Sequence, residues 1–413
     1  MTPIRIFLST IAACSTVLAK DPFLKTSGTV LRDGRGTGDA VVLRGANLGG
    51  WLEWQEWMCP IDASKTLRDA NPGHNGYDFE VRSLLAKRFG PAVADELIST
   101  YEENWITGAD LDHLRSFGFN AVRLPFGYAT LIDADGNWRK DAFHRLDWCV
   151  REAWRRGMYT ILDFHAFLPR SADQNGGRDG YWSNQAQLAE TVHIWIRVAE
   201  HYRNNPAVAC YDLLNEPNNS APHGKSGPES GQILAMYHRL YHAVRSADPE
   251  HAIAMEGFWD WRSLRDPREA GYQNIIYSFH WYHWDAKDTA TRKAGVDRDV
   301  ASVREMFKAW NVPAFIGEFN LFGDREAWRY GVTRYDEAGL SWTVWTCKHK
   351  NPGTQSWGLL NPVKGRVPRT PDLTKDSAET IRANWKAWRT TAETYAPNTL
   401  FDEILPTAPA HRR

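Results

Sequence analysis

The 413-residue sequence has no excess of either sign of charge, since 49 Lys and Arg residues stand against 50 Asp and Glu. It has no run of basic residues, and its longest charged clusters mix the two signs. These absences exclude the basic face typical of nucleic-acid-binding proteins, so we expect no nucleic-acid partner. The sequence also lacks a repeat of solenoid length and a low-complexity linker, which favours a single domain.

Cysteine is scarce. Apart from Cys14 near the N-terminus, the chain has only Cys59, Cys149, Cys210 and Cys347. Four cysteines in so long a chain exclude a disulfide framework, and their spacings match no zinc-binding pattern. We expect buried free thiols, with one disulfide bond as the alternative, and no metal or other cofactor.

The N-terminal apolar stretch, residues 6–19, is too short to span a bilayer as a stable anchor. It follows one positive charge and ends in small residues before the charged Lys20, which is typical of a secretory signal peptide over residues 1–19. The alternative is a bacterial lipoprotein signal that makes Cys14 a lipid anchor. Both interpretations predict a secreted or cell-envelope protein with no other membrane contact.

Aromatic residues are abundant, at 13% of the chain with 20 tryptophans. Sugar rings have apolar C–H faces that stack on aromatic side chains, so this composition favours a carbohydrate ligand. The alternative is that tryptophan simply fills the core. Nine tryptophans fall in predicted strand-to-helix loops, where some of them would form sugar-binding platforms: Trp51, Trp54, Trp57, Trp182, Trp259, Trp261, Trp281, Trp284 and Trp357.

Strand and helix patterns alternate along the chain. Strands are predicted at residues 41–48, 120–125, 159–165, 207–214, 252–256, 275–281, 312–318 and 340–346. Helices are predicted at residues 79–88, 92–117, 142–156, 185–204, 230–246, 300–310, 325–338 and 378–395, with a short one near Arg262. Eight such units predict an α/β fold, a (β/α)8 TIM barrel in one domain over residues 20–405, followed by a frayed tail at residues 406–413.

Two of the predicted strands deliver a glutamate at their carboxyl ends. Glu216 follows one apolar run and precedes Pro217, which stops the strand, and Glu318 ends another. Barrel enzymes carry their chemistry at this end of the strands, and the fourth and seventh strands face each other across the mouth. A single glutamate there would more often be a solvated loop acid. The pair predicts two carboxyl groups within about 5 Å, as retaining glycosidases need, with Glu216 as general acid/base and Glu318 as nucleophile.

Three segments carry a family resemblance: Leu-Asn-Glu-Pro at 214–217, Ile-Gly-Glu at 316–318 and Arg-Gly-Ala-Asn-Leu-Gly-Gly-Trp-Leu at 44–52. Together they resemble glycoside hydrolase family 5, the cellulase-type family of the large barrel clan. The opening segment is similar to its exo-β-1,3-glucanase branch. The resemblance covers nearly the whole mature chain. It implies a retaining β-glycosidase that acts on an oligo- or polysaccharide, with β-1,3 or mixed-linkage glucan favoured; we further expect a monomer.

The resemblance implies roles for further residues at the strand ends. Arg123 would support the nucleophile, and Tyr282 would bond to it. His280 would lie beside the acid/base. His165 and Trp345 would line the subsite of the scissile sugar. Singly, each of these residues has a plain structural explanation, as an internal ion pair, a core histidine or a core tryptophan; five at matching strand ends make coincidence unconvincing.

Other positions bear on substrate binding and specificity. Asn215 would hydrogen-bond the sugar 2-hydroxyl. Gln55 stands where the exo-β-1,3-glucanase branch has a glutamate that binds the terminal sugar, and Trp57 follows in the same aromatic run. Cys347 stands where a second tryptophan is expected, and the loop at 166–181 is longer than in that branch. These departures leave the exo mode and the linkage open.

The sequence is compatible with three alternative functions. A β-mannan hydrolase and a glycosidase that acts on glycolipid head groups are compatible with the longer loops. A carbohydrate-binding protein that kept the fold without activity is the alternative from another class. The retention of both glutamates together with Arg123, His280 and Tyr282 argues against it, because binding alone has no use for a paired acid and nucleophile.

Overall fold

Eight parallel strands close into a barrel, in a computed structural model that describes residues 21–61, 78–166, 181, 184–217, 228–257, 260–353 and 357–405. The strands are β4 (Arg44–Asn47), β5 (Ala121–Gly127), β6 (Tyr159–Ala166), β7 (Val208–Asp212), β8 (Ala252–Glu256), β9 (Ile275–Trp281), β10 (Ala314–Phe319) and β11 (Ser341–Val344). They are ordered β10-β11-β4-β5-β6-β7-β8-β9 around the barrel. The (β/α)8 prediction is therefore confirmed, and each of the eight predicted strands is present.

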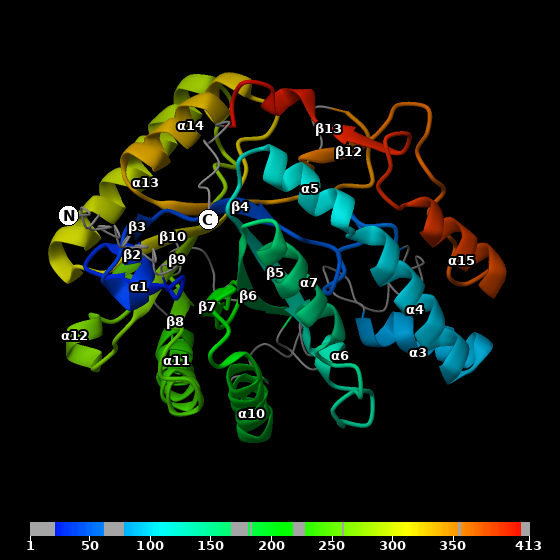
Figure 1. Cartoon of the computed structure of the whole chain (residues 1–413), viewed down its shortest axis with the longest axis horizontal. Coiled ribbons are helices and arrows are strands. Elements are labelled where there is room, and N and C mark those ends of the chain that lie inside the picture. Colours follow the sequence, from blue (N-terminus) through cyan, green and yellow to red (C-terminus); the bar gives the residue numbers. More distant parts are fainter. Residues whose placement is uncertain are drawn as a thin grey trace, which may run out of the picture.

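Helices surround the strands on the outside (Figure 1). They are α3 (Asp78–Phe89), α4 (Pro91–Trp105), α5 (Gly108–Ser116), α6 (Tyr128–Leu131), α7 (His144–Arg155), α10 (Gln185–Tyr202), α11 (Pro228–Ala247), α12 (Pro267–Ala270), α13 (Thr289–Trp310), α14 (Arg325–Glu337) and α15 (Ala378–Ala387), with the 3-10 turns η1 (Trp261–Ser263) and η2 (Thr399–Phe401). Because helices cover the outside and side chains fill the inside, the strands are buried on both faces. Every residue of β5, β9 and β10 is buried, which explains their nearly continuous apolar sequences.

Three of the predicted helices were wrong in their extent. The helix predicted at 92–117 is two helices, α4 and α5, because Thr107 and Asp110 form a capping box that starts a new helix. The helix predicted at 300–310 begins eleven residues earlier at Thr289, where Asp288 caps its N-terminus. The helix predicted at 378–395 ends at Ala387, and β13 (Tyr395–Pro397) instead pairs with β12 (Leu360–Pro362).

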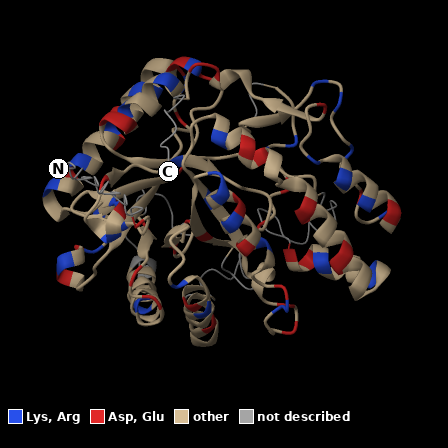
Figure 2. Ribbon diagram, viewed as in Figure 1, with Lys and Arg blue, Asp and Glu red and all other residues tan. Residues whose placement is uncertain are grey.

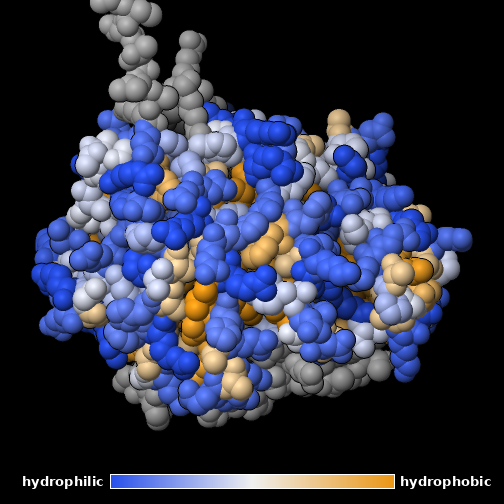
Figure 3. All heavy atoms as spheres, turned by 60° about the horizontal axis from the view of Figure 1, so that its bottom comes forward, coloured by the Kyte–Doolittle hydropathy of each residue, from blue (hydrophilic) through white to orange (hydrophobic). Residues whose placement is uncertain are grey.

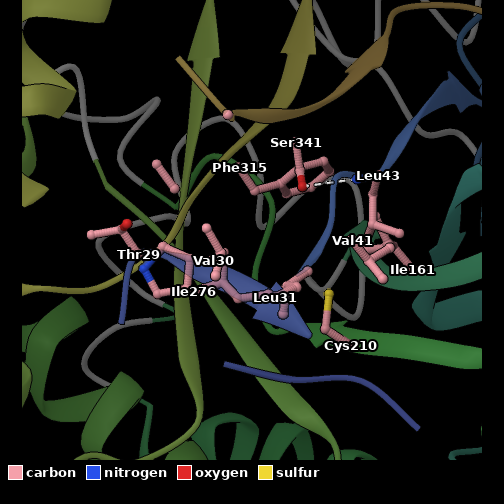
Figure 4. Close-up of a pocket in the computed structure, with 13 residues that line it drawn as sticks. Thr29, Val30, Leu31, Val41, Leu43, Ile161, Cys210, Ile276, Phe315 and Ser341 are labelled. Carbon is pink, nitrogen blue, oxygen red and sulfur yellow. Dashed lines mark hydrogen bonds between the residues drawn. The ribbon is translucent and has the colours of Figure 1, made fainter. Parts of the chain in front are cut away.

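A small antiparallel sheet covers the amino-terminal end of the barrel. Its strands are β1 (Lys25–Ser27), β2 (Val30–Arg32) and β3 (Ala40–Val41), with the short turn α1 (Asp33–Gly36) between the last two. Leu31 of this sheet packs with Ile161, Cys210 and Phe315 at the starts of barrel strands. The cavity between them, shown in Figure 4, has a volume of about 10 Å³ and holds at most one water molecule. This cavity is therefore too small for a sugar or a cofactor.

Charges of both signs are interspersed along the outer helices (Figure 2). On the face shown in Figure 3, hydrophilic side chains predominate, and apolar ones form small groups between them. Among the described residues, no helix combines the length and the apolar character needed to cross a bilayer. Cys59, Cys149, Cys210 and Cys347 are buried free thiols, as expected, and not a disulfide pair.

Several expectations concern residues outside those that the structure describes. They are the N-terminal segment 1–19 with Cys14, the tail 406–413, Trp182, Trp259 and the loop at 166–181 apart from Ala166 and Tyr181.

A buried ion pair ties α5 to the segment that follows β11. Asp110 and Lys348 are both fully buried, and their charged atoms lie 3.7 Å apart. The Asp110 carboxylate also accepts hydrogen bonds from the Thr107 backbone N–H at 2.7 Å and from the Thr390 hydroxyl at 2.5 Å. The Lys348 ammonium donates to the Trp388 carbonyl oxygen at 2.9 Å. This contact joins the barrel to its C-terminal extension.

Replacement of Asp110 should therefore destabilise the fold strongly. We expect Asp110→Ala to lower the free energy of unfolding by about 3–5 kcal/mol, because the Lys348 ammonium is left buried without its counter-ion. Asp112→Ala is the matched control on the same helix, since that exposed carboxylate pairs with Arg156 and its loss costs about 0–1 kcal/mol. Urea unfolding followed by circular dichroism measures both. Equal losses for the two variants would contradict this structural role.

Candidate active site

Glu216 and Glu318 face a common neighbour at the carboxyl ends of the strands. Nδ1 of His280, on β9, lies 2.9 Å from Glu216 Oε1 and 3.5 Å from Glu318 Oε2. These two carboxyl oxygens are therefore no farther apart than the sum of the two distances. Glu318 lies within β10, whereas Glu216 lies in the turn after β7. The Glu216 side chain is 22% exposed and that of Glu318 only 6%.

Both carboxyl oxygens of Glu318 receive a strong donor. The Arg123 guanidinium donates to Oε1 at 2.9 Å, and the Tyr282 hydroxyl donates to Oε2 at 2.7 Å. Arg123 is fully buried, so this ion pair is shielded from water. Two such donors, one of them charged, stabilise the negative form of the carboxylate.

Arg123 itself is the centre of a larger network. Its guanidinium lies 2.9 Å from Asp212 and 3.1 Å from Asp163, and it donates to the amide oxygens of Asn47 and Asn215 at 3.0 Å each. Burial alone would lower the pKa of Arg123, but Asp163 and Asp212 outweigh it and raise that pKa above its usual value. Arg123 therefore remains a cation that orients groups from several strands.

His165, on β6, lies on the other side of this network. Its Nδ1 is 2.9 Å from Asp163, and its ring stacks on Trp345 with a centroid distance of 5.1 Å. Its Nε2 lies 3.3 Å from the Asn215 amide nitrogen. Burial would lower the pKa of His165, but the carboxylates of Glu53 and Asp163 raise it to about 9.

Gln55 and Trp57 adjoin this histidine through the loop after β4. The Trp57 indole N–H donates to Gln55 Oε1 at 2.8 Å, and Gln55 Nε2 lies 3.4 Å from His165 Nε2. Gln55 also donates to both oxygens of Glu53, a carboxyl that is 1% exposed and whose pKa is raised by burial. The Gln55 amide is thus held between a donor and an acceptor.

The structure connects all ten residues that the sequence nominated in one chain of contacts. They are Gln55, Trp57, Arg123, His165, Asn215, Glu216, His280, Tyr282, Glu318 and Trp345. Sequence reasoning did not identify Asn47, Asp163, Asp212 and Glu256 as members of this site. Glu256 had a usable signal, because it ends an apolar strand as the other two glutamates do.

Glu256 brings a third carboxyl group to His280. Its Oε2 accepts the backbone N–H of Glu216 at 2.5 Å, and its Oε1 lies 3.4 Å from His280 Nδ1. Burial raises the pKa of Glu256 well above its usual value. Burial opposes the charged form of His280, but the carboxyl groups of Glu256 and Glu318 raise the pKa of that ring to about 10.

Glu216, Glu256 and His280 also offer the carboxylate and imidazole groups that bind metal ions in proteins. Potential ligand atoms of Glu216, Glu256 and His280 lie within 4.8 Å of one another. His280 Nδ1 lies directly against both carboxyl groups, 2.9 Å from Glu216 Oε1 and 3.4 Å from Glu256 Oε1. These contacts describe an ion-paired cluster around the imidazole.

An aromatic surface extends outward from Tyr282. Trp284 is 62% exposed, and its ring lies 5.3 Å from that of Tyr282, 5.6 Å from that of Trp357 and 5.2 Å from that of Phe322. Trp357 in turn lies 5.2 Å from Trp57. In contrast, four of the tryptophans predicted in loops are buried: Trp51, Trp54, Trp261 and Trp281. Those four fill the core. The aromatic surface instead consists of Trp284 and its neighbours Tyr282, Phe322 and Trp357.

Paired carboxyl groups at the mouth of such a barrel are the arrangement of a glycosidase. A family model described as Cellulase (glycosyl hydrolase family 5) matches residues 88–351, which is more than half of the chain. The chain belongs to glycoside hydrolase family 5, and the protein is a glycosidase with a saccharide substrate.

Curated relatives support this assignment. The chain is 28% identical over 361 residues to a β-xylosidase of Phanerodontia chrysosporium, across 79% of this chain and 71% of the relative. It is 24% identical over 392 residues to a probable glucan 1,3-β-glucosidase A of Aspergillus niger, across 90% and 89% of the two chains.

Solved structures share the fold. An endogalactoceramidase aligns with a TM-score of 0.61 at 17% identity, covering 88% of this chain and 84% of that chain. The endo-glycoceramidase II from Rhodococcus sp. aligns with a TM-score of 0.58 at 20% identity, covering 81% and 77%. At these identities the likeness establishes the barrel architecture alone.

The protonation of the site histidines is directly measurable. With pKa values raised to about 9 and about 10, His165 and His280 should remain imidazolium at pH 7.5. Their contribution to stability is complete below about pH 6.5, the usual histidine pKa, and is lost as the pH rises to 9–10. His349 is the control, because burial lowers its pKa to about 4 and keeps it neutral. Nitrogen-15 NMR titration of the imidazole signals measures all three, and a midpoint near 6.5 for His280 would contradict the described ion pairs.

Proposed function

We propose that the protein is a retaining β-glycoside hydrolase that cleaves β-glucan by double displacement, with Glu318 as nucleophile and Glu216 as general acid/base. The observation that carries the proposal is the asymmetry of the two carboxyl groups around His280. Both oxygens of Glu318 accept hydrogen bonds, from Arg123 and from Tyr282, so its ionised form is stabilised. The Glu216 carboxyl is the more exposed one, as a group that exchanges protons with substrate and water must be.

In the first step, the Glu318 carboxylate attacks the anomeric carbon while Glu216 gives its proton to the glycosidic oxygen. The bond between these two substrate atoms breaks, and the leaving sugar departs with the proton. A covalent ester between the sugar and Glu318 remains. A separation of about 5–5.5 Å between the carboxyl groups suits this direct attack, whereas inversion needs a wider gap for water.

In the second step, water replaces the leaving sugar. The Glu216 carboxylate takes a proton from the water, whose oxygen attacks the anomeric carbon. The ester bond breaks, and Glu318 is released as a carboxylate. Asn215 is suited to bind the sugar 2-hydroxyl, because its side chain is held by Arg123 at 3.0 Å beside the nucleophile. Two inversions leave the anomeric configuration unchanged.

The substrate we favour is β-1,3 or mixed-linkage glucan. The glucan 1,3-β-glucosidases among the relatives and the opening segment at 44–52 support this choice. His165, Trp345 and Gln55 would surround the sugar that becomes attached to the enzyme. The exposed Trp284, next to Tyr282, would stack on the sugar that leaves. We also propose that the protein is exported, as its N-terminal segment predicts.

Product analysis on a panel of glycans tests the substrate. We expect laminarin and lichenan to yield short oligosaccharides or glucose, and cellulose and mannan to yield little product. An aryl β-xyloside and lactosylceramide complete the panel, because a relative and two fold neighbours carry names that point to such substrates. Glu318→Gln is the control for contaminating activity. Preferred cleavage of mannan, the xyloside or the glycolipid would overturn the glucan assignment.

Covalent labelling tests the mechanism. A 2-fluoro glucoside with a good leaving group should form a stable ester with Glu318, because the fluorine slows the second step more than the activated first step. Mass spectrometry of peptides locates the label, and proton NMR of fresh products should show the retained β anomer. Glu326→Gln is a matched control, since this glutamate lies on α14 with a side chain 70% exposed. Labelling at another carboxylate, or an inverted product, would refute the proposed roles.

A further inference from the structure

Double displacement employs two carboxyl groups, but the cluster at His280 contains three. Glu256 lies at the end of β8 and is 5% exposed. Neither the attack on the sugar nor the proton transfer requires it. A buried carboxyl group in a functional site carries a desolvation cost, so its presence needs a physical explanation.

Glu256 contacts Glu216 through the backbone. Its Oε2 accepts the N–H of Glu216 at 2.5 Å. Glu216 has a φ of 41°, in the left-handed region that residues other than glycine rarely adopt. The backbone N–H of Glu256 is fixed in turn by the Tyr237 hydroxyl at 3.1 Å. The contact thus holds the turn that presents the Glu216 side chain.

Glu256 also balances a charge. The protonated ring of His280, 2.9 Å from Glu216, favours the ionised form of that carboxyl. The first step of the reaction requires the opposite, since a general acid must hold a proton. Glu256 lies 3.4 Å from the same ring nitrogen. Burial raises the pKa of Glu256, but the imidazolium opposes that shift and favours the ionised carboxylate, which contributes charge of the opposite sign. Like charge near Glu216 favours retention of its proton.

The other groups around His280 do not replace this effect. Among the described residues, the other charged and titratable groups of the cluster are Arg123 on β5, Asp163 on β6, Asp212 on β7, Glu318 on β10, Tyr282 after β9 and Tyr237 on α11. Glu318 is 3.5 Å from the imidazole, but Arg123 compensates its charge. Asp212 is likewise paired with Arg123 at 2.9 Å. Glu256 lacks a guanidinium partner among the described residues and faces His280 and Glu216.

We propose that Glu256 is a positioning residue for the general acid: it fixes the backbone of Glu216 and offsets the charge of His280, so that Glu216 keeps its proton at neutral pH. This inference rests on the proposed function, in which Glu216 is the acid. The same arrangement serves the second step. After Glu216 has given up its proton, His280 stabilises the resulting carboxylate until it takes a proton from water.

Glu256→Gln separates charge from position, because the amide oxygen can still accept the Glu216 N–H. On a glycan with a poor leaving group, the alkaline limb of the kcat/KM profile should move to lower pH by about 1–2 units. At the acidic end of the pH range, the kcat of this variant should be lower than that of the wild type by less than tenfold. A dinitrophenyl glucoside should keep its alkaline activity in this variant, since its leaving group needs no proton.

Glu256→Asp tests position with the charge retained. The shorter side chain should no longer accept the hydrogen bond from the Glu216 N–H, so kcat should fall at every pH. The alkaline limb of the kcat/KM profile should stay within about half a pH unit of its wild-type position. Tyr237→Phe is the control for disturbance behind the site and should leave the alkaline limb in place. Thermal unfolding of each variant establishes that it is folded. If Glu256→Gln is unfolded, the test rests on the alkaline limb of the kcat/KM profile of Glu256→Asp. A displacement of that limb by a full pH unit overturns the inference.

The outcomes separate this inference from the function on which it rests. A wild-type enzyme that is labelled at Glu318, together with a Glu256→Gln profile superimposable on wild type, overturns the role of Glu256 alone. A wild-type protein that cleaves no β-glycoside, or that is labelled elsewhere, overturns the proposed function before Glu256 is considered. A shifted alkaline limb for poor leaving groups, absent for the dinitrophenyl glucoside, supports both.

Discussion

The site depends on the ion pairs that the guanidinium of Arg123 forms with three carboxylates. The guanidinium is fully buried, and its partners Asp163, Asp212 and Glu318 come from three other barrel strands. A buried cation is costly unless its donors are satisfied, and closure of the barrel is what brings these acceptors around it. The same closure makes Glu318 an oriented carboxylate. The charge that the fold must neutralise is thus also the one that stabilises the carboxylate of Glu318, the nucleophile that we propose.

The two ends of the barrel divide stability from chemistry. At the amino-terminal end, Leu31 of the small sheet packs on apolar residues and leaves room for at most one water molecule. At the carboxyl-terminal end, polar side chains meet, and the aromatic surface around Trp284 leads from them to solvent. This is the division of labour that barrel enzymes share.

The sequence allowed the eight strands to be predicted because parallel strands buried on both faces are short apolar runs with clear ends. The site residues followed from strand-end motifs and from the family resemblance. The break before α5 was missed, since Thr107 lies inside an otherwise helical pattern and its capping partner is recognised only when a boundary is suspected. The contacts of Arg123 with Asp163 and Asp212 were also beyond sequence reasoning, because they span 40 and 89 residues and depend on strand register.

Charge balance explains why the site can hold a proton on an acid. Among the described residues, the connected cluster contains six carboxyl groups and three basic groups: Glu53, Asp163, Asp212, Glu216, Glu256 and Glu318 against Arg123, His165 and His280. Full ionisation would leave uncompensated negative charge in a buried site, which is unfavourable. Burial accordingly raises the pKa of Asp212 to about 6 even beside Arg123. Burial also raises the pKa of Glu256 well above its usual value, so this cluster favours the retention of protons. In the mechanism that we propose, Glu216, the most exposed of the three carboxyl groups around His280, is the one that transfers a proton to the substrate.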